Sequence, residues 1–338
     1  MRGYPARRRC VISQAIGESA QTIVAVHQLA KTFRVGFWAR PVAALRQVTF
    51  EMRRGESLGY LGPNGSGKTT SIKCMLGLIA PSAGQVALFG RPPSDPLARA
   101  RVGFLAESPY FYDYLTPNEV LDYVAKLYGI DGPTRRKRSR ALLGQVGLDH
   151  AAHRPLRGFS KGMLQRVGIA QSLIADPELL VWDEPLSGLD PVGRNEVREL
   201  MGELRRQGKS LFFSSHVLSD IESLCDAVCI LDQGVAVAQG KLTDLLRADA
   251  LESVAHLGLP DDGGAALLAL QAVPLSHWEP LADGQRVVLP TAQVAELCRV
   301  AVQAGATLRE LNPRRDSLEQ LFLRKAVTRR QDSVGSPA

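Results

Sequence analysis

Eight residues, Gly62 to Thr69, have the composition and spacing of a phosphate-binding loop. They read Gly-Pro-Asn-Gly-Ser-Gly-Lys-Thr, between an apolar run that ends at Leu61 and a stretch from Thr70 that can start a helix. Glycines let the backbone curl until its N–H groups converge on an anion, and the helix dipole adds positive potential. Every required position and both flanks agree, which disfavours a chance glycine-rich turn.

Each position of this loop has an expected part in binding a nucleotide. The side chain of Lys68 can reach the β- and γ-phosphates, and the hydroxyl of Thr69 can coordinate Mg²⁺. The residues expected to contact the nucleotide are Gly62, Pro63, Asn64, Gly65, Ser66, Gly67, Lys68, Thr69 and Thr70. The loop alone leaves the reaction class open.

Two later apolar runs end in side chains that can do chemistry. The first, Leu179 to Trp182, ends in Asp183 and Glu184, and the second, from Phe212, ends at His216. A buried strand would deliver Asp183 to the Mg²⁺ shell and leave Glu184 where a water can attack a phosphate. An ordinary strand-end acid and a core histidine are the alternatives, and the motif context disfavours both.

Two short peptides complete an ordered set. Phe159 to Arg166 reads Phe-Ser-Lys-Gly-Met-Leu-Gln-Arg, and Ser187 to Asp190 reads Ser-Gly-Leu-Asp. With the loop, the acid pair and the histidine, they resemble the ATP-binding cassette (ABC) family of transport ATPases over residues 23–240. A P-loop kinase or a GTPase has no reason to carry the peptide 160–162 just before the acid pair.

This resemblance implies a fold and a reaction. The fold is α/β, with a P-loop NTPase (RecA-like) core, an inserted helical subdomain and a small C-terminal α+β domain. The reaction is hydrolysis of ATP with Mg²⁺. Its expected catalytic residues are Lys68, which neutralises the phosphates, Glu184, which activates the water, and His216, which contacts the γ-phosphate. Thr69 and Asp183 are expected to hold the metal.

The resemblance also implies a second copy of the chain. In the family, the positions of Ser160, Gly162 and Asp190 contact ATP that the opposite subunit holds. One phosphate loop therefore cannot complete the site, and we expect a head-to-tail homodimer with two-fold symmetry. ATP then bridges the two copies, so that dimer stability follows nucleotide occupancy.

Two places depart from the family's commonest pattern. Lys161 and Met163 replace a glycine and a glutamine, which looks like the branch that powers two-component exporters of the ABC-2 type. Glu107 stands where the family normally has a glutamine after a strand. A glutamate can still bind Mg²⁺, so Glu107 is expected as a metal ligand, although its added charge leaves its exact role open.

The adenine ring needs a flat partner, and stacking on an aromatic face tolerates varied geometry. Phe33, after Lys31 and Thr32, occupies the position of the family's adenine-stacking aromatic residue. Phe37 and Trp38 compete for this role, because the expected loop from Arg34 to Pro41 is longer than usual. The alternative for Phe33 is a buried core residue.

Composition limits the other functional classes. The chain has 338 residues, a net charge of +7 and five cysteines without framework spacing, which suits a reducing compartment. Cys225 and Cys229 have no second pair with which to form a metal site. The basic cluster from Arg135 to Arg140 indicates a solvated helix face or an attraction to anionic lipid. No nucleic-acid motif accompanies it, so no nucleic-acid partner is expected.

No apolar run approaches the ~18 residues that a membrane span requires. The arginines at positions 7–9 are not followed by an apolar run, so the N-terminus is not a secretory signal. We therefore expect the transport path to lie in another polypeptide, a membrane permease subunit.

The chain is expected to divide into two domains between polar tails. A disordered tail covers 1–22, the ABC ATPase nucleotide-binding domain covers 23–248 with its helical subdomain at about 107–178, a C-terminal accessory α+β domain covers 249–325, and a polar tail covers 326–338. Helical spacing predicts helices at 118–128, 134–146, 162–175 and 193–207. Gln233-Gly234 predicts a hairpin turn.

The C-terminal domain is expected to read strand, helix, strand, strand, helix, strand, with the first helix at 265–271. Thr291 is the expected N-cap of the helix 294–302, and Asp316 with Glu319 resembles a capping box. The module resembles the accessory domain of the exporter branch, which often ends in a peptide like Ser317 to Leu323.

Four aromatic residues, Tyr110, Phe111, Tyr112 and Tyr114, crowd into five positions just after Glu107, in a chain with only 6% aromatics. Some can belong to the core. In the resembled family, the groove behind this position receives a short helix of the membrane subunit. Rigid aromatic anchors suit such docking.

The sequence thus predicts the ATPase subunit of an ABC-2-type exporter, peripheral at the cytoplasmic face of the cell (inner) membrane. One alternative is a soluble ABC ATPase that acts on ribosomes or DNA, which tends to carry two cassettes or a long coiled coil. Another is a non-hydrolysing nucleotide sensor, against which the intact Glu184 and His216 argue.

Overall fold

The computed structural model describes residues 21–247, 252–260, 270, 277–281, 283–313 and 318. Two compact units divide between Lys241 and Leu242, and each is described by itself. The division falls seven positions before the boundary expected at residue 249. The tail 326–338, the Asp316–Glu319 pair, most of the tail 1–22 and most of the helix expected at 265–271 lie outside the described residues.

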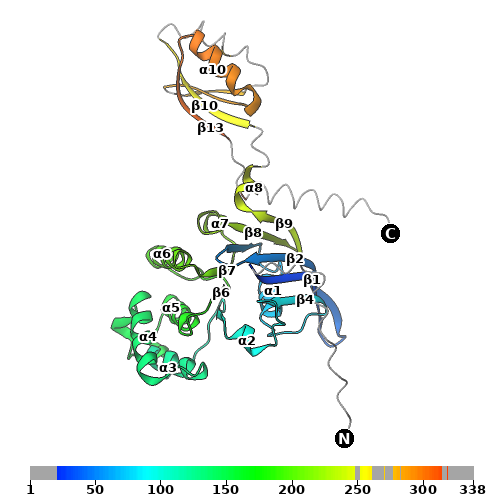
Figure 1. The fold of residues 1–338 in the computed structure, drawn as a ribbon. Coiled ribbons are helices and arrows are strands. Elements are labelled where there is room, and N and C mark those ends of the chain that lie inside the picture. The colour runs from blue at the N-terminus through cyan, green and yellow to red at the C-terminus, as the bar shows by residue number, and fades with distance from the viewer. Residues whose placement is uncertain are drawn as a thin grey trace. The chain divides into compact units, whose positions relative to one another are not determined.

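In the described part of the first unit, nine strands form a sheet in the order β4-β1-β2-β9-β8-β3-β7-β6-β5 (Figure 1). The strands are β1 Thr22–Val35, β2 Arg40–Arg53, β3 Ser57–Leu61, β4 Ala83–Leu88, β5 Val102–Leu105, β6 Leu179–Trp182, β7 Ser210–Ser215, β8 Ala227–Asp232 and β9 Val235–Lys241. Strands β8, β3, β7, β6 and β5 are parallel, whereas β1 pairs antiparallel with β2 and β4. The parallel strands therefore deliver their carboxyl ends to one edge.

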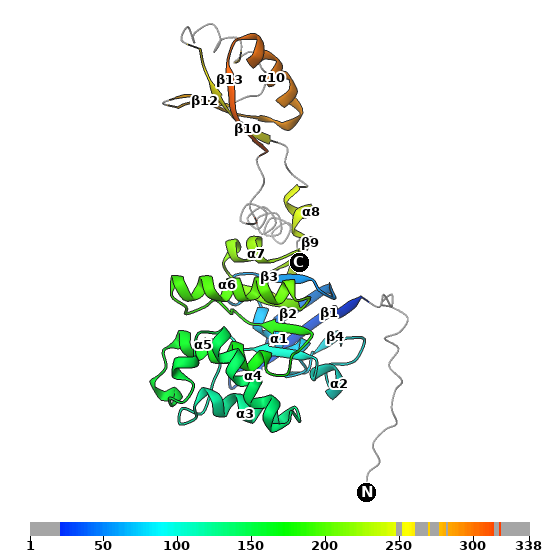
Figure 2. The same cartoon turned by 60° about the vertical axis from the view of Figure 1, so that its left-hand side comes forward.

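Seven α-helices accompany these strands within the described residues. They are α1 Lys68–Met75, α2 Pro96–Arg99, α3 Pro117–Leu127, α4 Gly132–Gln145, α5 Lys161–Leu173, α6 Pro191–Arg206 and α7 Leu218–Leu224. Helices α3, α4 and α5 lie together between β5 and β6 in the chain, away from β1 and β4 (Figure 2). This insertion is the predicted helical subdomain.

The ends of the inserted helices follow from their capping residues. Thr116 and Glu119 form a complete capping box at α3, with Pro117 in its first turn. The helix predicted from Thr134 begins at Gly132, because Asp131 caps it and Pro133 fits a first turn. The prediction that Gly132 and Pro133 precede the helix was therefore wrong.

The basic cluster on α4 is only partly solvated. Arg135 pairs with Asp122 at 2.6 Å, and Arg138 donates to the carbonyl of Ile174 at 3.1 Å. Arg136, Lys137 and Arg140 are exposed or nearly so. The cluster thus holds the helical subdomain together on one side and presents charge on the other.

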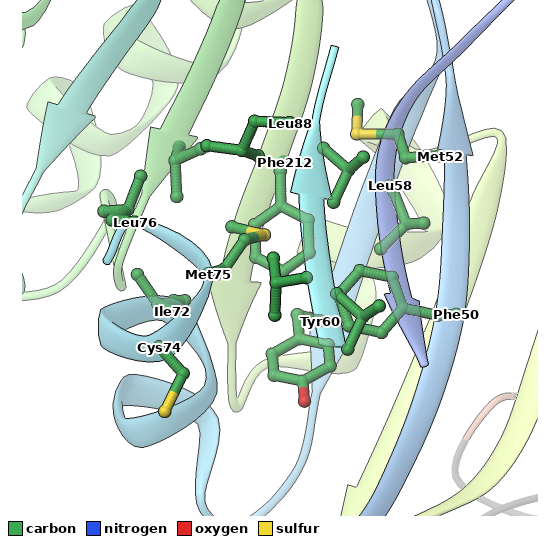
Figure 3. Close-up of a cluster of buried hydrophobic side chains, with 14 of the residues drawn as sticks. Phe50, Met52, Leu58, Tyr60, Ile72, Cys74, Met75, Leu76, Leu88 and Phe212 are labelled. Atoms are coloured by element: carbon green, nitrogen blue, oxygen red, sulfur yellow. The ribbon is translucent and has the colours of Figure 1, made fainter. Parts of the chain in front are cut away.

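A core of aromatic and aliphatic side chains lies between α1 and strands β1–β4 and β7 (Figure 3). The rings of Phe50, Tyr60 and Phe212 lie within 5.3–5.7 Å of one another. Tyr60 is fully buried, its hydroxyl bonds Ser71 Oγ at 2.8 Å, and burial raises its pKa well above the usual value. This packing fixes α1, and with it the loop that precedes α1.

The β1–β2 connection corrects one prediction. The segment from Arg34 to Pro41, expected as a loop, is strand at both of its ends, because the ladder continues to the pair Val35–Arg40. The actual turn is Gly36 to Ala39, with φ of 76° and 47° at its ends and a 3.0 Å bond from Ala39 N to Gly36 O. The chain therefore extends a two-stranded ribbon at this place.

The described part of the second unit is a small α+β module. It contains α8 Leu242–Arg247, β10 Glu252–Gly258, β11 His277–Leu281, β12 Gly284–Pro290, α10 Val294–Gln303 and β13 Thr307–Pro313. Its antiparallel sheet has the order β11-β12-β10-β13, and α10 packs Leu297 and Ala301 against it. Thr291 is not the N-cap of α10. That position is Gln293, and the Thr291 hydroxyl lies 3.0 Å from Ser253 Oγ instead.

Among the described helices, none has the length and apolar character needed to cross a bilayer.

Candidate nucleotide-binding site

The predicted phosphate loop lies between the buried strand β3 and the N-terminus of α1. Gly65 and Gly67 have φ of 80° and 106°, a region that favours glycine. A Cβ on Gly67 would stand 2.7 Å from the Ala44 carbonyl, so the close packing also excludes a side chain. The loop thus has the backbone shape that the motif requires.

A second hairpin supports the loop from behind. The β8–β9 turn has positive φ at Gln233 and Gly234, as predicted for a two-residue hairpin. Gly234 N donates to Ser66 O at 2.9 Å, and Arg46 N donates to Gly234 O at 2.8 Å. The turn therefore connects the phosphate loop to β2.

The three predicted catalytic side chains meet at the front of this loop. Lys68 Nζ donates to Gly62 O at 2.6 Å and lies 3.4 Å from Glu184 Oε1. The other carboxylate oxygen of Glu184 is 2.9 Å from His216 Nδ1. Lys68 and Glu184 are each 7% exposed, whereas the His216 side chain is half-exposed. The cation of the loop thus lies against the carboxylate.

Asp183 and Glu184 are held by one side chain that the sequence interpretation missed. Ser214 Oγ donates to Asp183 Oδ1 at 2.6 Å and accepts from Glu184 N at 2.8 Å. Glu184 has φ of 50°, a strained value for a non-glycine residue. A serine inside a buried apolar strand was the available signal, because buried hydroxyls need partners.

Gln165 of α5 is a second side chain without a predicted role. It is 1% exposed, and its Nε2 donates to Pro185 O at 3.2 Å and more weakly to Glu184 O at 3.4 Å. It therefore ties the helical subdomain to the segment that carries the acid pair.

A cavity of about 380 Å³ opens over the loop. Its lining residues are Ala44, Pro63, Asn64, Gly65, Gly67, Lys68, Thr69, Thr70, Glu107 and Glu184. The exposed Glu107 is thus placed beside Thr69 and Glu184, whereas the buried Asp183 is not part of this lining. The sequence predicted that these residues share one site. It did not predict that Glu107 is exposed there and that Asp183 is buried.

The donor set fits Mg²⁺ bound together with nucleotide phosphates. Thr69 offers a hydroxyl, and Asp183 and Glu107 offer carboxylates, which are oxygen ligands of the kind Mg²⁺ prefers. Within the described ranges, no group of three or more His, Cys, Asp or Glu is placed to hold a metal alone. Mg²⁺ usually keeps waters and uses one or two carboxylates plus substrate phosphates.

The residues predicted to act on a second copy lie apart from this cavity. Ser160 and Asp190 are exposed N-caps of α5 and α6, and they accept from Met163 N and Gly193 N. A Cβ on Gly162 would stand 3.4 Å from Leu189, so the two peptides adjoin. None of the three lines the cavity over the loop.

Phe33 stands at the base of the β1–β2 ribbon, 37% exposed, with Lys31 Nζ 5.1 Å from its ring centre. It is therefore not the buried core residue that was the alternative. Phe37 and Trp38 contact each other edge to face at 5.5 Å in the turn. None of these rings lines the cavity over the loop.

The aromatic cluster after Glu107 is largely on the surface. Tyr110, Tyr112 and Tyr114 are 90%, 62% and 67% exposed, and Phe111 is partly buried. The rings of Tyr112 and Tyr114 stack at 5.7 Å. Most of the cluster is thus exposed and does not belong to the core.

The sequence comparisons agree with this geometry. The family model described as ABC transporter matches residues 45–187. An ABC transporter ATP-binding protein of Synechocystis sp. is 38% identical, over 94% of this chain and 90% of the relative. The bacitracin transport ATP-binding protein BcrA of Bacillus licheniformis is 35% identical, over 82% and 90%. The Nod factor export ATP-binding protein I of Ralstonia nicotianae is 39% identical, over 59% and 63%.

Solved structures give the same fold. An ATP-binding subunit of an ABC transporter matches with a TM-score of 0.60 and 33% identity, over 67% of this chain and 93% of that chain. A dimeric ATP-binding cassette in a post-hydrolysis state, bound to ADP and phosphate, matches with a TM-score of 0.61 and 24% identity, over 65% and 99%. The predicted P-loop NTPase fold class is confirmed.

Proposed function

Because the chain belongs to the ABC transporter family as an ATP-hydrolysing subunit, we propose that it powers export through a separate ABC-2-type membrane subunit. It then acts at the cytoplasmic face of the cell (inner) membrane. The Lys68–Glu184–His216 cluster at the phosphate loop supports the hydrolysis on which this proposal depends, since a hydrolysing motor needs that carboxylate. The names of the bacitracin and Nod factor relatives support transport and export.

The residues divide the work of hydrolysis. Lys68 neutralises the β- and γ-phosphates, and Glu184 orients and deprotonates a water. His216, held at 2.9 Å by Glu184, contacts the γ-phosphate. Thr69, Asp183 and Glu107 would hold Mg²⁺, which would neutralise phosphate charge. The Asp183 carboxylate, which is buried, would be held in place by the hydrogen bond that it accepts from Ser214 Oγ.

The site is completed by a second copy of the chain. Ser160 and Asp190 are exposed, Gly162 is partly exposed, and none of the three lines the cavity over their own phosphate loop, so we assign them to the loop of the partner. Helix N-termini at α5 and α6 suit an anionic γ-phosphate at this surface. We also propose that the nucleotide-binding domain covers residues 23–248 and that the C-terminal accessory domain covers residues 249–325.

The test is purification of the tagged full chain from solubilised membranes of its own organism. We expect a stoichiometric partner with several membrane spans, and ATPase activity that changes when the partner is present. Recovery with ribosomes or DNA and without a membrane protein would contradict the proposal and support a soluble ABC ATPase instead.

Phe33 is the proposed partner of the adenine ring. Phe33→Ala is expected to weaken ATP binding by about 1–2 kcal/mol, because the stacking face is lost, with turnover of bound ATP nearly unchanged. Equilibrium binding of a fluorescent ATP analogue measures the change, and Trp38→Ala is the matched control. If Trp38→Ala weakens binding and Phe33→Ala does not, the adenine lies farther along the ribbon.

A further inference from the structure

The β1–β2 ribbon projects from the sheet without a partner. The last pair of β1 with β4 is Ala30–Ala83, whereas the pairing of β1 with β2 continues to Val35–Arg40. In the part of the chain that the structure describes, residues 33–42 make no hydrogen bond or ion pair with any element other than β1 and β2. We call residues 34–42 the ribbon tip.

Large apolar side chains of the ribbon tip face solvent. Phe37 is 95% exposed and Trp38 is 79% exposed, and among the described residues the only aromatic ring that each contacts is the other. Val35 and Val42 are 54% and 50% exposed, and the register places them on one face of the ribbon. Rings of this size are seldom left in water without a function.

The charge around these rings has one sign. Residues 21–50 contain four cations, Lys31, Arg34, Arg40 and Arg46, and no Asp or Glu. Arg34 and Arg40 flank the turn and have no carboxylate partner among the described residues. Trp and Phe beside unpaired arginines is the chemistry of a membrane–water interface, where rings enter the headgroup layer and guanidinium groups meet phosphates.

From these observations we propose that the ribbon tip inserts Phe37 and Trp38 into the headgroup region of an anionic phospholipid bilayer. A strand rises about 3.4 Å per residue, so the ring pair stands on the order of 10 Å beyond Phe33. That reach matches the roughly 5–10 Å depth at which interfacial apolar faces are buried. The tip therefore contacts lipid while Phe33 remains at the ribbon base for the nucleotide.

This contact goes beyond the proposed transport function, because it belongs to the chain itself and needs no membrane subunit. The contact holds the nucleotide-binding unit to the bilayer at one place, the ribbon tip. The two proposals fail separately: lipid binding is measured with the purified chain and vesicles, and transport function is measured with the membrane subunit.

The first experiment is sedimentation of the full chain with vesicles that contain about 30% phosphatidylglycerol, at about 0.1 M salt. We expect binding that weakens with added salt and is nearly lost on pure phosphatidylcholine. Phe37→Ser with Trp38→Ser, and separately Arg34→Gln with Arg40→Gln, should each lower the affinity roughly tenfold.

Two controls match these changes in exposure and charge. Leu97→Ser removes an apolar side chain that is 63% exposed on α2, and Arg136→Gln with Arg140→Gln removes two cations from α4. Both variants should bind vesicles like the wild type. An unchanged melting temperature for every variant establishes that the fold is retained.

Tryptophan fluorescence reports the insertion directly. The chain has three tryptophans, of which Trp182 is fully buried. In a Trp278→Phe background, brominated lipid in the vesicles should quench Trp38, and the further change Trp38→Phe should abolish that quenching. Wild-type binding by the Phe37–Trp38 variant, loss of binding in the α4 variant, or no binding to anionic vesicles would overturn the proposal. Binding that appears only with the membrane subunit present would do so too, and would identify a protein partner.

Discussion

Glu184→Gln is expected to slow ATP turnover by about 10²–10⁴-fold, because the change removes the base beside the attacking water. The amide keeps the size of the carboxylate and still reaches His216, and the bond from Glu184 N to Ser214 Oγ is a backbone contact. The strained backbone at Glu184 therefore has the same support in the variant. ATP binding should survive.

The same variant should accumulate as an ATP-bound dimer. In the dimer proposed for the wild type, hydrolysis would remove the γ-phosphate that bridges the phosphate loop and the Ser160 peptide of the second copy. When hydrolysis stops, the bridge persists and association gains from ligand binding by mass action. Gel filtration with and without ATP measures this shift directly.

Glu178→Gln is the matched control, at the other end of β6. Glu178 pairs with Arg101 and Arg54, and the hydrogen bond from Arg101 lowers its pKa to about 2. Because the pKa of Glu178 is lowered in the folded state, its ionised carboxylate stabilises the fold at pH values above 4.5, the usual pKa of glutamate. This contribution is lost as pH falls from 4.5 toward about 2. The control variant should keep its turnover and lose some stability at neutral pH, and this loss should shrink as pH falls from about 4.5 toward 2. Wild-type turnover in Glu184→Gln would place the base on another residue.

Replacement of Tyr110, Tyr112 and Tyr114 by Ala together is expected to abolish transport and recovery of the membrane subunit. Hot spots in interfaces are typically aromatic residues that fill a pocket of the partner, and truncation of several removes most of the binding energy. ATPase activity of the isolated chain should largely survive, because none of the three lines the cavity over the phosphate loop.

The backbone around the tyrosines explains how docking can influence the site. Arg157 N donates to Asp113 O and Leu156 N donates to Leu115 O, each at 2.8 Å. These two bonds connect the aromatic segment to the turn just before Ser160. The aromatic segment begins at Tyr110, three positions after Glu107. Under the proposed function, docking at the tyrosines would therefore act on Glu107 at the chain's own nucleotide site and on Ser160, which we propose for the partner's site.

Tyr123→Ala is the control for this prediction, since Tyr123 is 59% exposed on α3 of the same subdomain. Transport assays and affinity recovery of the membrane subunit should not distinguish it from the wild type. If Tyr123→Ala abolishes recovery while the triple variant keeps it, the docking surface is the groove between α3 and α4.

The sequence by itself determined the features that are written in consecutive residues. The phosphate loop, the acid pair after β6 and the hairpin turn at Gln233-Gly234 were predicted because a strand, a glycine pattern and a helix start are local signals. The order of those peptides was enough to identify the family and the fold class. The helices of the insertion were found for the same reason, with an error of two residues where Asp131 and Pro133 start α4 early.

Only the tertiary structure decided which distant residues support these peptides. Gly234 bonds Ser66 across 168 positions, Ser214 joins Asp183 to the backbone of Glu184, and Gln165 reaches Pro185 from another subdomain. The ribbon beyond Phe33 likewise depends on a ladder register, which composition alone does not set. Such contacts depend on how strands and helices pack against one another in three dimensions. The spacing of residues along the sequence does not determine these distances.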